Sequence, residues 1–532
     1  MPRCRVGVLE LIAATAALHS RLRPSFWAEI VIKRQFYSVM PQAVSAWSRL
    51  RGHETHYATF YGQGRPEDLL PDDLDIVFLA TPTQHSMLSY ALAAIFRARG
   101  ARVVLAGPHA RAYPEDCAAH ADIVVTDCDR QLVDDILAER IGPGSIVTSA
   151  RPLADLPLVE EREPEIRAAA FVDGRQGRTT TISLLSSLGC PYACDFCSEW
   201  ATPYAAFGTD RMTRELDVIA ARYPGALIGF HDPNFGVRFD QIMAAFEARD
   251  RPQSNPFAME SSLSLLDRGR LARLRAAGCL LVAPGIESFA DYSAKSRATR
   301  VSGVAKYAAV SARFREIEEA IPTVQANLIL GVDADAGDEP FILARRFIAE
   351  HPKVWTNVNI PIPFGRTPFA ERVRREGRLV EALPFAFYTA PYLSMHPLHY
   401  ELDDYLTRLS EVYADLVSLR LLARRLRLLD SAFARGVVVA RTAALRVEYG
   451  ELTAFRTALR EQPDMRRFYA GRSRRLPAFL RHRMRARLGR YAASLPDETI
   501  RDWAPRGAED RVQVAGLHCD AATRAAAPEA AP

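Results

Sequence analysis

Short apolar runs alternate with amphipathic stretches along the chain, and this alternation restricts the fold more than any other feature of the sequence. Between residues 1 and 135 the runs RVGVLEL, DIVFLATP, ARVVLAGPHA and ADIVVTDC are separated by helical stretches such as SMLSYALAAIFRARG. Apolar runs separated by helices are typical of a parallel sheet that is covered on both faces. We therefore predict an α/β protein that begins with a doubly wound parallel sheet, with any ligand at the carboxyl ends of its strands.

The bulk composition is that of a globular protein. A chain of 532 residues is too long for one ordinary core, so we expect several domains. The net charge of +5 does not require a nucleic-acid partner, and we expect none. Eight cysteines over this length do not form a disulfide framework, which favours a reducing compartment. The segment VGVLELIAATAAL has the length of a signal peptide, but Glu10 interrupts it and RVGVLEL is explained as a buried strand, so we expect a cytoplasmic protein.

Three cysteines follow the strand-like segment TTTISLLSSLG in the spacing C-x3-C-x2-C: Cys190, Cys194 and Cys197. Thiolates favour iron–sulfur clusters and zinc. A structural zinc site is usually closed by four protein ligands, but no second paired element follows, since Cys279 and Cys519 are isolated. Three cysteines can instead hold three corners of a [4Fe–4S] cluster and leave the fourth iron open to a small molecule. Zinc and incidental cysteines remain the alternatives.

This spacing, with Phe196 directly before the last cysteine, resembles the radical S-adenosylmethionine (radical SAM) superfamily. The resemblance implies a cluster whose open iron binds S-adenosylmethionine. Reductive cleavage of that molecule gives a 5′-deoxyadenosyl radical, which abstracts hydrogen from the substrate. It also implies a partial TIM-type (β/α)6 barrel with its active site at the carboxyl ends of the strands. About six strand–helix units between residues 181 and 375 agree with this expectation.

The resemblance further implies cofactor-binding residues at the ends of successive strands. HDPNFG (231–236) resembles the family segment that lies near the amino group of the methionine part of S-adenosylmethionine. GIES (285–288) resembles the family's fourth strand. NLILGVD resembles the family's adenine-contact region on the fifth strand, and Asp333 lies at the end of this segment. The implied set is Phe196, Asp232, Asn234, Glu260, Gly285, Glu287, Ser288, Asn327 and Gly331. A turn stabilised by side-chain hydrogen bonds remains the alternative for Asp232 and Asn234, and a solvated or ion-paired carboxylate for Glu260.

Two later segments depart from the family pattern. The usual P-G-E-T ending of the fifth strand is replaced by DADAGDEP, and in PIPFGRTPF the residues Gly365 and Thr367 keep their spacing while Arg366 intervenes. The contacts of these loops are therefore left open.

The segment VVLAGPHARAYPEDCAAHADIVVTDC resembles the cobalamin-binding domain that precedes many radical SAM domains. The family usually supplies a histidine to cobalt from a D-x-H-x-x-G loop after the first strand. This chain has LELIAATAALHSRL there, and His19 lacks the Asp and Gly context. Cobalamin is therefore held without a protein histidine or is missing, while His109 is placed at a strand end near the predicted ligand edge.

Beyond residue 375 the chain becomes mostly helical. An aromatic segment there offers Tyr388, Tyr392, His396 and His399 as substrate contacts, with ordinary packing as the alternative. The basic amphipathic stretch RFYAGRSRRLPAFLRHRMRARLGRY either meets an anionic membrane or partner peripherally, or packs on the barrel with a solvated outer face. The predicted organisation is a flavodoxin- or Rossmann-like, cobalamin-binding-like domain (1–140), a linker (141–180), the radical SAM barrel (181–375), a helical domain (376–506) and a disordered tail (507–532).

The function that we predict is cobalamin-dependent methyl transfer to a small-molecule substrate by a radical SAM enzyme. The expected cofactors are a [4Fe–4S] cluster, S-adenosylmethionine and, less firmly grounded in the motifs, cobalamin. A radical rearrangement, cyclisation or oxidation beside a vestigial cobalamin domain is one alternative, and a non-catalytic zinc or iron–sulfur scaffold is another. The expected partners are a natural-product or lipid intermediate as substrate, and a reductase, flavodoxin or ferredoxin as electron donor.

Overall fold

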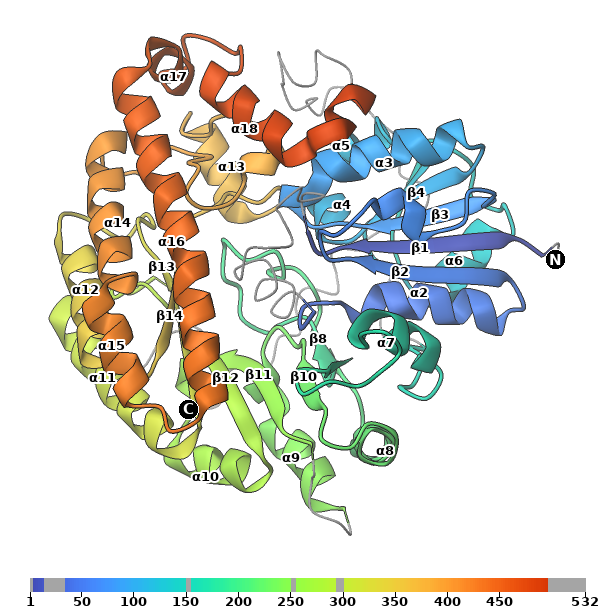
Figure 1. The fold of residues 1–532 in the computed structure, drawn as a ribbon, viewed down its shortest axis with the longest axis horizontal. Coiled ribbons are helices and arrows are strands. Elements are labelled where there is room, and N and C mark those ends of the chain that lie inside the picture. Colours follow the sequence, from blue (N-terminus) through green and yellow to red (C-terminus); the bar gives the residue numbers. More distant parts are fainter. Residues whose placement is uncertain (1–2, 14–33, 150–154, 250–254, 293–300, 496–532) are drawn as a thin grey trace, which may run out of the picture.

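Two parallel six-stranded sheets lie side by side, and a helical C-terminal part packs against both (Figure 1). This computed structural model describes residues 3–13, 34–149, 155–249, 255–292 and 301–495. His19 and the predicted tail from residue 507 lie outside the described residues. In the described part of the chain, no helix has the length and apolar character needed to cross a membrane.

The first sheet has the strand order β2-β1-β3-β4-β5-β6, and all of its neighbouring strands are parallel. This is the doubly wound order of flavodoxin-like folds, which confirms the predicted fold class. Because side chains alternate along a strand, Val6 and Val8 pack on one face beside Trp47, while Leu9 and Leu11 pack on the other. The strands are β1 (Arg5–Leu11), β2 (Glu54–Phe60), β3 (Ile76–Ala80), β4 (Arg102–Ala106), β5 (Ile123–Val125) and β6 (Ser145–Val147).

The helices that belong to this sheet connect its strands or cover its faces. They are α2 (Val39–Leu50), α3 (Ser86–Ala98), α4 (Pro108–Ala112), α5 (Pro114–Ala118), α6 (Arg130–Leu137) and α7 (Glu163–Ala170). The strand β6 and the helix α7 fall inside the segment 141–180, for which the sequence predicted a linker or an extended crossover. Glu165 of α7 is nevertheless buried and forms an ion pair with Arg49 of α2 at 3.1 Å, so the segment is packed against the first sheet.

The second sheet runs β7-β10-β11-β12-β13-β14, in the order of the chain, with every neighbouring pair parallel. Such an order is that of an incomplete (β/α) barrel, as predicted. Its strands are β7 (Thr181–Leu184), β10 (Leu227–Phe230), β11 (Phe257–Ser262), β12 (Cys279–Glu287), β13 (Thr323–Ile329) and β14 (Trp355–Asn359). The helices between them are α8 (Thr209–Arg222), α9 (Phe239–Glu247), α10 (Arg268–Ala276), α11 (Gly303–Ala320) and α12 (Glu339–Glu350).

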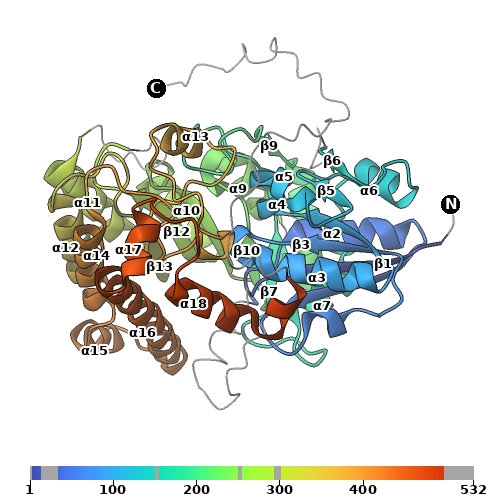
Figure 2. The same cartoon turned by 90° about the horizontal axis from the view of Figure 1, so that it is seen from above.

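The C-terminal helices close the side of the barrel and reach back to the first sheet. They are α13 (Pro368–Arg375), α14 (Leu402–Leu416), α15 (Leu419–Arg427), α16 (Ala432–Glu461), α17 (Pro463–Tyr469) and α18 (Ala478–Leu488). In Figure 1 the long helix α16 runs in front of β13 and β14. Figure 2 shows α18 between the helical part and α3, and just after it the hydroxyl of Tyr491 donates to Glu67 at 2.5 Å.

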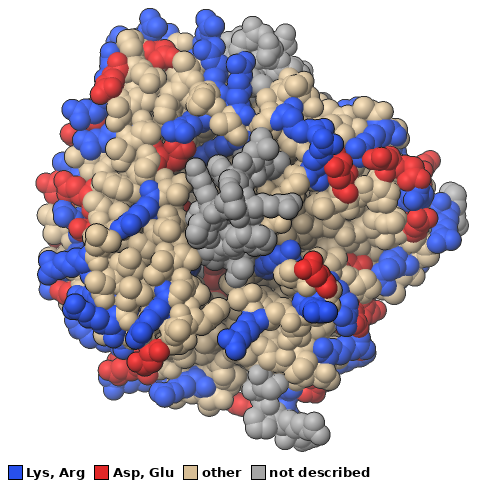
Figure 3. Space-filling model, viewed as in Figure 1, with Lys and Arg blue, Asp and Glu red and all other residues tan. Residues whose placement is uncertain are grey.

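The predicted basic amphipathic stretch includes α18. Its apolar side chains Leu480, Met484 and Leu488 are buried, and Arg487 donates to the carbonyl of Ala386 at 2.8 Å. On the face drawn in Figure 3, acidic and basic side chains are interspersed rather than gathered into one patch of a single sign.

The carboxyl ends of the two sheets meet. Tyr113, which joins α4 and α5 after β4, donates to the carbonyl of Pro363 at 3.2 Å, just after β14. Its ring packs 4.0 Å from that of Phe385. A Cβ on Gly365 would lie 2.2 Å from the carbonyl of Ala112, so only glycine permits this close approach of the two parts.

Candidate functional site

The three cysteines lie on one loop between the short strands β8 (Ser187–Leu188) and β9 (Ala205–Ala206). The loop begins at Gly189, which has a φ of 71° and whose Cβ would lie 2.4 Å from the carbonyl of Pro203. Only glycine fits this turn. Cys190, Cys194 and Cys197 are all of intermediate burial and are not joined in disulfides, and the amide of Cys197 donates to the carbonyl of Cys194 at 3.1 Å.

The chemistry of this donor set fits an iron–sulfur cluster, which is held by thiolates. Within the described residues, no three His, Cys, Asp or Glu side chains are gathered so as to hold a metal ion. Binding a cluster therefore requires the three cysteine side chains to turn toward a common point. Cys279 lies in the core instead, where burial raises its pKa to about 12 and so keeps it protonated.

Asp232, at the end of β10, anchors the approach to the cysteine loop. Its buried carboxylate accepts hydrogen bonds from the amide and hydroxyl of Ser186, at 3.0 and 2.6 Å, and from the hydroxyl of Ser187 at 2.6 Å. Burial raises the pKa of Asp232, while these hydrogen bonds lower it. The sequence singled out Asp232 but not the two serines, whose meeting with it depends on the pairing of β7 with β10.

Asn234 links the same loop to β11. Its side-chain nitrogen lies 2.7 Å from the hydroxyl of Ser262 and 4.0 Å from the sulfur of Cys190. Its side-chain oxygen accepts from the amide of Ser262 at 3.0 Å. The amide of Asn234 is therefore fixed beside the first cysteine, where the sequence analysis expected a cofactor contact.

Phe196 lies on an aromatic and apolar surface at the far side of the loop. Its ring stacks on Tyr292 with centroids 5.2 Å apart and packs against the cluster of Phe369, Val373 and Met395. These partners are far away in the sequence, and the sequence analysis did not identify them. The stacking holds the side chain next to Cys197 in one orientation.

Helix α13 clamps the cysteine loop with charges. Arg372 forms ion pairs with Asp195, inside the cysteine motif, at 2.7 Å and with Asp333, after β13, at 3.1 Å. Arg378 pairs with the same oxygen of Asp333 at 3.0 Å. The amide of Phe369 donates to the carbonyl of Asp195 at 3.0 Å. The loop is thus tied to the last part of the barrel as well as to β10.

The predicted GIES segment has an unusual backbone. Glu287 has a φ of 59°, a left-handed value that costs a non-glycine residue about 1 kcal/mol or more. Its carboxylate folds back toward Gly285, where a Cβ would lie 2.3 Å from it. The hydroxyl of Ser288 donates to Asp335, whose other oxygen accepts from the amide of Gly331 at 2.9 Å. Burial raises the pKa of Asp335 to about 6.

The predicted residues of β11, β12 and β13 share the inner face of the barrel sheet. Gly285 pairs in register with Ser262 and Asn327, and Glu260, two residues before Ser262, is exposed on this face. The side chain of Asn327 accepts from Gln325 at 2.9 Å. The structure therefore brings Glu260, Gly285 and Asn327 to one surface, as expected of residues at one end of parallel strands.

His109, which the sequence placed near the ligand edge of the first sheet, is fully buried. Its Nε2 lies 2.6 Å from the hydroxyl of Tyr90, and its ring packs 5.2 Å from that of Phe385. Burial lowers the pKa of His109, so it is neutral near pH 7. In this arrangement the side chain is packed within the protein rather than presented to a ligand.

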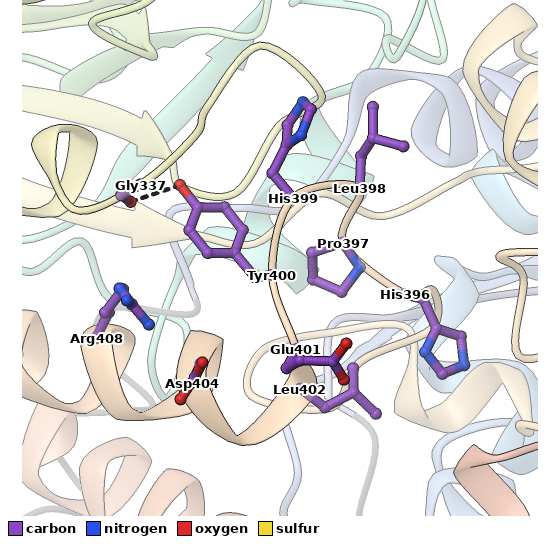
Figure 4. Close-up of a pocket in the computed structure, with 10 residues that line it drawn as sticks. All are labelled: Gly337, His396, Pro397, Leu398, His399, Tyr400, Glu401, Leu402, Asp404 and Arg408. Atoms are coloured by element: carbon purple, nitrogen blue, oxygen red, sulfur yellow. Dashed lines mark hydrogen bonds between the residues drawn. The ribbon is translucent and has the colours of Figure 1, made fainter.

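A pocket of about 500 Å3 lies between Gly337, on the loop that follows β13, and the start of α14 (Figure 4). His396 and His399 line it, and His399 Nε2 lies 3.1 Å from the carbonyl of Asp333. The other two substrate candidates of the sequence analysis, Tyr388 and Tyr392, are buried in the core instead. This pocket does not include the cysteines or the inner face of the sheet, so we do not assign the reaction to it.

Comparison with known proteins agrees with this geometry. Residues 184–335 match the model of the radical SAM superfamily. Over 130 residues the chain is 35% identical to bacteriochlorophyllide d C-8(2)-methyltransferase of Chlorobaculum tepidum. The aligned stretch is 24% of this chain and only 28% of that protein. Over 323 residues it is 23% identical to the C-12(1)-methyltransferase of the same organism, covering 58% of this chain and 69% of that protein.

Among solved structures, the cobalamin-dependent S-adenosylmethionine radical enzyme OxsB, with aqua-cobalamin and S-adenosylmethionine bound, has a similar fold. The TM-score is 0.55 at 11% identity, over 90% of this chain and 75% of that one. At this identity the likeness concerns the fold alone. Together with the three cysteines on their loop, the family match identifies residues 184–335 as a radical SAM domain.

Proposed function

We propose that this chain is a radical SAM enzyme that methylates a small molecule with the help of cobalamin. The observation that carries the proposal is that the carboxyl end of the first sheet borders the cysteine loop. Arg111, after β4, pairs with Asp127, after β5, and with Glu199, beside Cys197, each at 2.6 Å. Ligands of doubly wound sheets bind at this edge. A corrinoid held there is therefore next to the residues that hold the cluster.

The cofactors of the family are a [4Fe–4S] cluster and S-adenosylmethionine. When bound to Cys190, Cys194 and Cys197, the cluster supplies the electron for reductive cleavage of S-adenosylmethionine and an open coordination site for it. The chain contributes the positioning. Asp232 holds the loop from the side of β10, and Arg372 holds it from the side of α13.

For S-adenosylmethionine we propose contacts along the inner face of β11, β12 and β13. Glu260 and Glu287 offer carboxylates to hydroxyl or amino groups, and Asn327 offers an amide. A Cβ on Gly285 would meet Glu287 and one on Gly331 would meet Tyr405, so this packing requires glycine at both positions, and we propose that their backbone borders the ligand. Asn234 and Phe196 complete the set beside the cysteines.

The methyl-transfer part of the proposal is supported by the names of the two curated relatives, both methyltransferases, and by the cobalamin bound in OxsB. We propose that the acceptor is a small molecule, such as a natural-product or lipid intermediate. A reductase, flavodoxin or ferredoxin in the cytoplasm is the proposed electron donor, because cluster and thiols need a reducing compartment.

A radical rearrangement, cyclisation or oxidation without cobalamin is the second candidate. The observation that favours it is the state of His109, which is buried and bonded to Tyr90. No D-x-H-x-x-G motif follows the first strand either. Both facts agree with a first sheet that no longer binds a corrinoid.

Anaerobic reconstitution of the full-length protein with iron and sulfide, with and without hydroxocobalamin, tests these proposals. We expect broad charge-transfer absorbance, cleavage of S-adenosylmethionine after reduction, and a corrinoid spectrum that stays with the protein through gel filtration. S-adenosylhomocysteine among the products indicates methyl donation, whereas 5′-deoxyadenosine alone favours the second candidate. One bound zinc without cleavage indicates the scaffold alternative.

The Cys194→Ala variant should lose the cluster absorbance and should form neither S-adenosylhomocysteine nor 5′-deoxyadenosine, because the cluster would lack one of its three cysteine ligands. The matched control is Cys4→Ala, which removes a thiol just before β1, outside the cysteine loop. Undiminished cleavage in Cys194→Ala contradicts the assignment of the site.

A further inference from the structure

The inner face of β13 and β14 is polar, although its outer face is apolar. Val324, Ala326 and Leu328 of β13 are buried in the core that contains the outer helices, whereas Gln325 and Asn327, on the other face, are partly accessible. A strand directs alternate side chains to opposite faces. Solvent therefore reaches the inner face of the barrel sheet.

The neighbouring strand extends this polar surface. In the register of the two strands, Gln325 lies opposite Trp355, and Asn327 lies opposite Asn357. The amide of Gln325 donates to Asn327 at 2.9 Å, and that of Asn357 donates to the same oxygen at 3.4 Å. A ladder of amides thus runs from the amino-terminal end of the sheet toward the residues proposed for S-adenosylmethionine.

Arg441 of α16 meets the amino-terminal end of this ladder. Its guanidinium lies 4.2 Å from the ring centroid of Trp355 and donates to the side-chain oxygen of Gln325 at 3.3 Å. Arg425 of α15 lies 4.8 Å from the same ring, but its nitrogens donate to the carbonyls of Pro352 and Val354 at 3.1 and 3.2 Å. Arg441 therefore has free donors, whereas those of Arg425 are used to hold the backbone before β14.

Neither guanidinium forms an ion pair with a carboxylate in the described part of the chain. Other partly buried arginines do, for example Arg49 with Glu165 and Arg111 with Asp127. Burial lowers the pKa of Arg441 to about 10, and burial together with the charge of Arg441 lowers the pKa of Arg425 to about 10. Both remain charged near pH 7. A desolvated charge without a counter-ion is costly, and an anionic ligand removes this cost.

We infer that Arg441 binds a carboxylate of the substrate at the amino-terminal end of the inner face. The inference rests on the proposed function, because it places the substrate in the barrel of a radical SAM enzyme. The planar guanidinium fork matches the two oxygens of a carboxylate, and Arg425 adds a second positive charge nearby. The substrate class is therefore an organic acid.

The spacing along β13 sets how far the anchored end of such a substrate lies from the residues proposed for S-adenosylmethionine. From Gln325 to Asn327 the strand rises about 7 Å, at roughly 3.3 Å per residue. The carboxylate is thus held about one small-molecule length below the layer of Gly285 and Asn327, which we propose for S-adenosylmethionine. A molecule anchored at Arg441 points its other end toward that layer.

The test uses benzoate and its neutral isostere benzamide with the full-length protein, without S-adenosylmethionine or reductant. Binding is followed by tryptophan fluorescence and by the thermal midpoint. We expect saturable binding of benzoate and much weaker binding of benzamide. Arg441→Gln should weaken benzoate at least about tenfold, because it removes a charge-assisted pair of hydrogen bonds. Arg420→Gln, which removes an exposed charge from α15, is the matched control and should bind benzoate as the wild type does.

Equal affinity for benzoate in Arg441→Gln and the wild type overturns the inference, and so does the absence of saturable benzoate binding to the wild type. If Arg441→Gln does not fold, Arg441→Lys decides, since it keeps the charge but loses the fork. Reduced affinity in that variant supports the inference, and unchanged affinity refutes it. Because no cleavage reaction is measured, failure here is distinct from failure of the proposed radical SAM activity.

Discussion

Two glycines on the loop after β13, Gly331 and Gly337, allow the energetic cost of one packing contact in the candidate site to be measured. Gly331 has a φ of 87°, and its Cβ would lie 2.4 Å from the ring of Tyr405. That ring has no room to move, because Tyr405 is fully buried and its hydroxyl donates to the carbonyl of Leu330 at 2.7 Å. Gly337 has a φ of 66°, but nothing lies within 4 Å of its Cβ.

The cost of Gly331→Ala has two parts. The left-handed backbone costs an alanine about 1 kcal/mol, and overpacking against Tyr405 adds about 1–3 kcal/mol. We therefore expect the free energy of unfolding to fall by about 2–4 kcal/mol in Gly331→Ala, and by only about 1 kcal/mol in Gly337→Ala. Urea denaturation of the two variants beside the wild type, followed by tryptophan fluorescence and circular dichroism, measures the difference.

The comparison isolates the packing, because both glycines share the loop and the backbone region. If the two variants lose the same stability, then Tyr405 does not restrict Gly331 and the packing of α14 on this loop is not as described. If Gly331→Ala is folded at low temperature, its binding of S-adenosylmethionine should also weaken, since the clash with Tyr405 displaces backbone that we propose to border that ligand. The binding of Gly337→Ala should be unchanged.

Two further predictions concern the carboxylates around the site. Asp232→Ala should leave the donors of Ser186 and Ser187 unpaired, lower the free energy of unfolding by about 2–5 kcal/mol and lower the cluster content after reconstitution. Asp232→Asn keeps one acceptor oxygen and should retain more cluster than Asp232→Ala. Equal cluster content in the two variants contradicts the anchoring role of Asp232. Burial raises the pKa of Asp335 from 3.8 to about 6, so the folded state holds its proton more tightly than the unfolded chain does. The free energy of unfolding should therefore fall by on the order of 3 kcal/mol as the pH rises between these two pKa values. Asp335→Asn should reduce this dependence on pH, as measured by the urea midpoint at several pH values in the same range.

The sequence was sufficient for features that depend on neighbours along the chain. The apolar runs predicted the first parallel sheet, because a buried strand is recognised from a few consecutive residues. The second sheet was expected from the resemblance of the cysteine motif, and the strand–helix segments agreed with it. The sequence was not sufficient for β6 and α7, which are short and lack strong periodicity, and which owe their place to the first sheet and to Glu165. Single short elements of this kind are stabilised by tertiary packing rather than by their own propensity.

The same division holds within the candidate site. Asp232, Asn234 and Glu287 stood out because they lie in segments near strand ends that resemble the family pattern, but their partners did not. Asp335 was hidden in a loop that departs from the family pattern, and Tyr292 and Arg372 lie about 100 and 175 residues from Phe196 and Cys197 along the chain. No local pattern connects such residues, because the distance between them is set by the packing of whole strands and helices.

By itself, the sequence determined the reactive chemistry of this protein, since three thiols within eight residues on one loop define a ligand set wherever the loop lies. The tertiary structure alone decided which groups surround that loop and the inner face of the barrel. Asp232 meets two serines because β7 pairs with β10, and Arg441 meets Trp355 because α16 crosses β13 and β14. The physical reason is that the kind of metal or cluster a thiolate can bind depends on the side chain itself. Which charges lie nearby, how far they are from water and which groups can touch one another depend on the assembled fold.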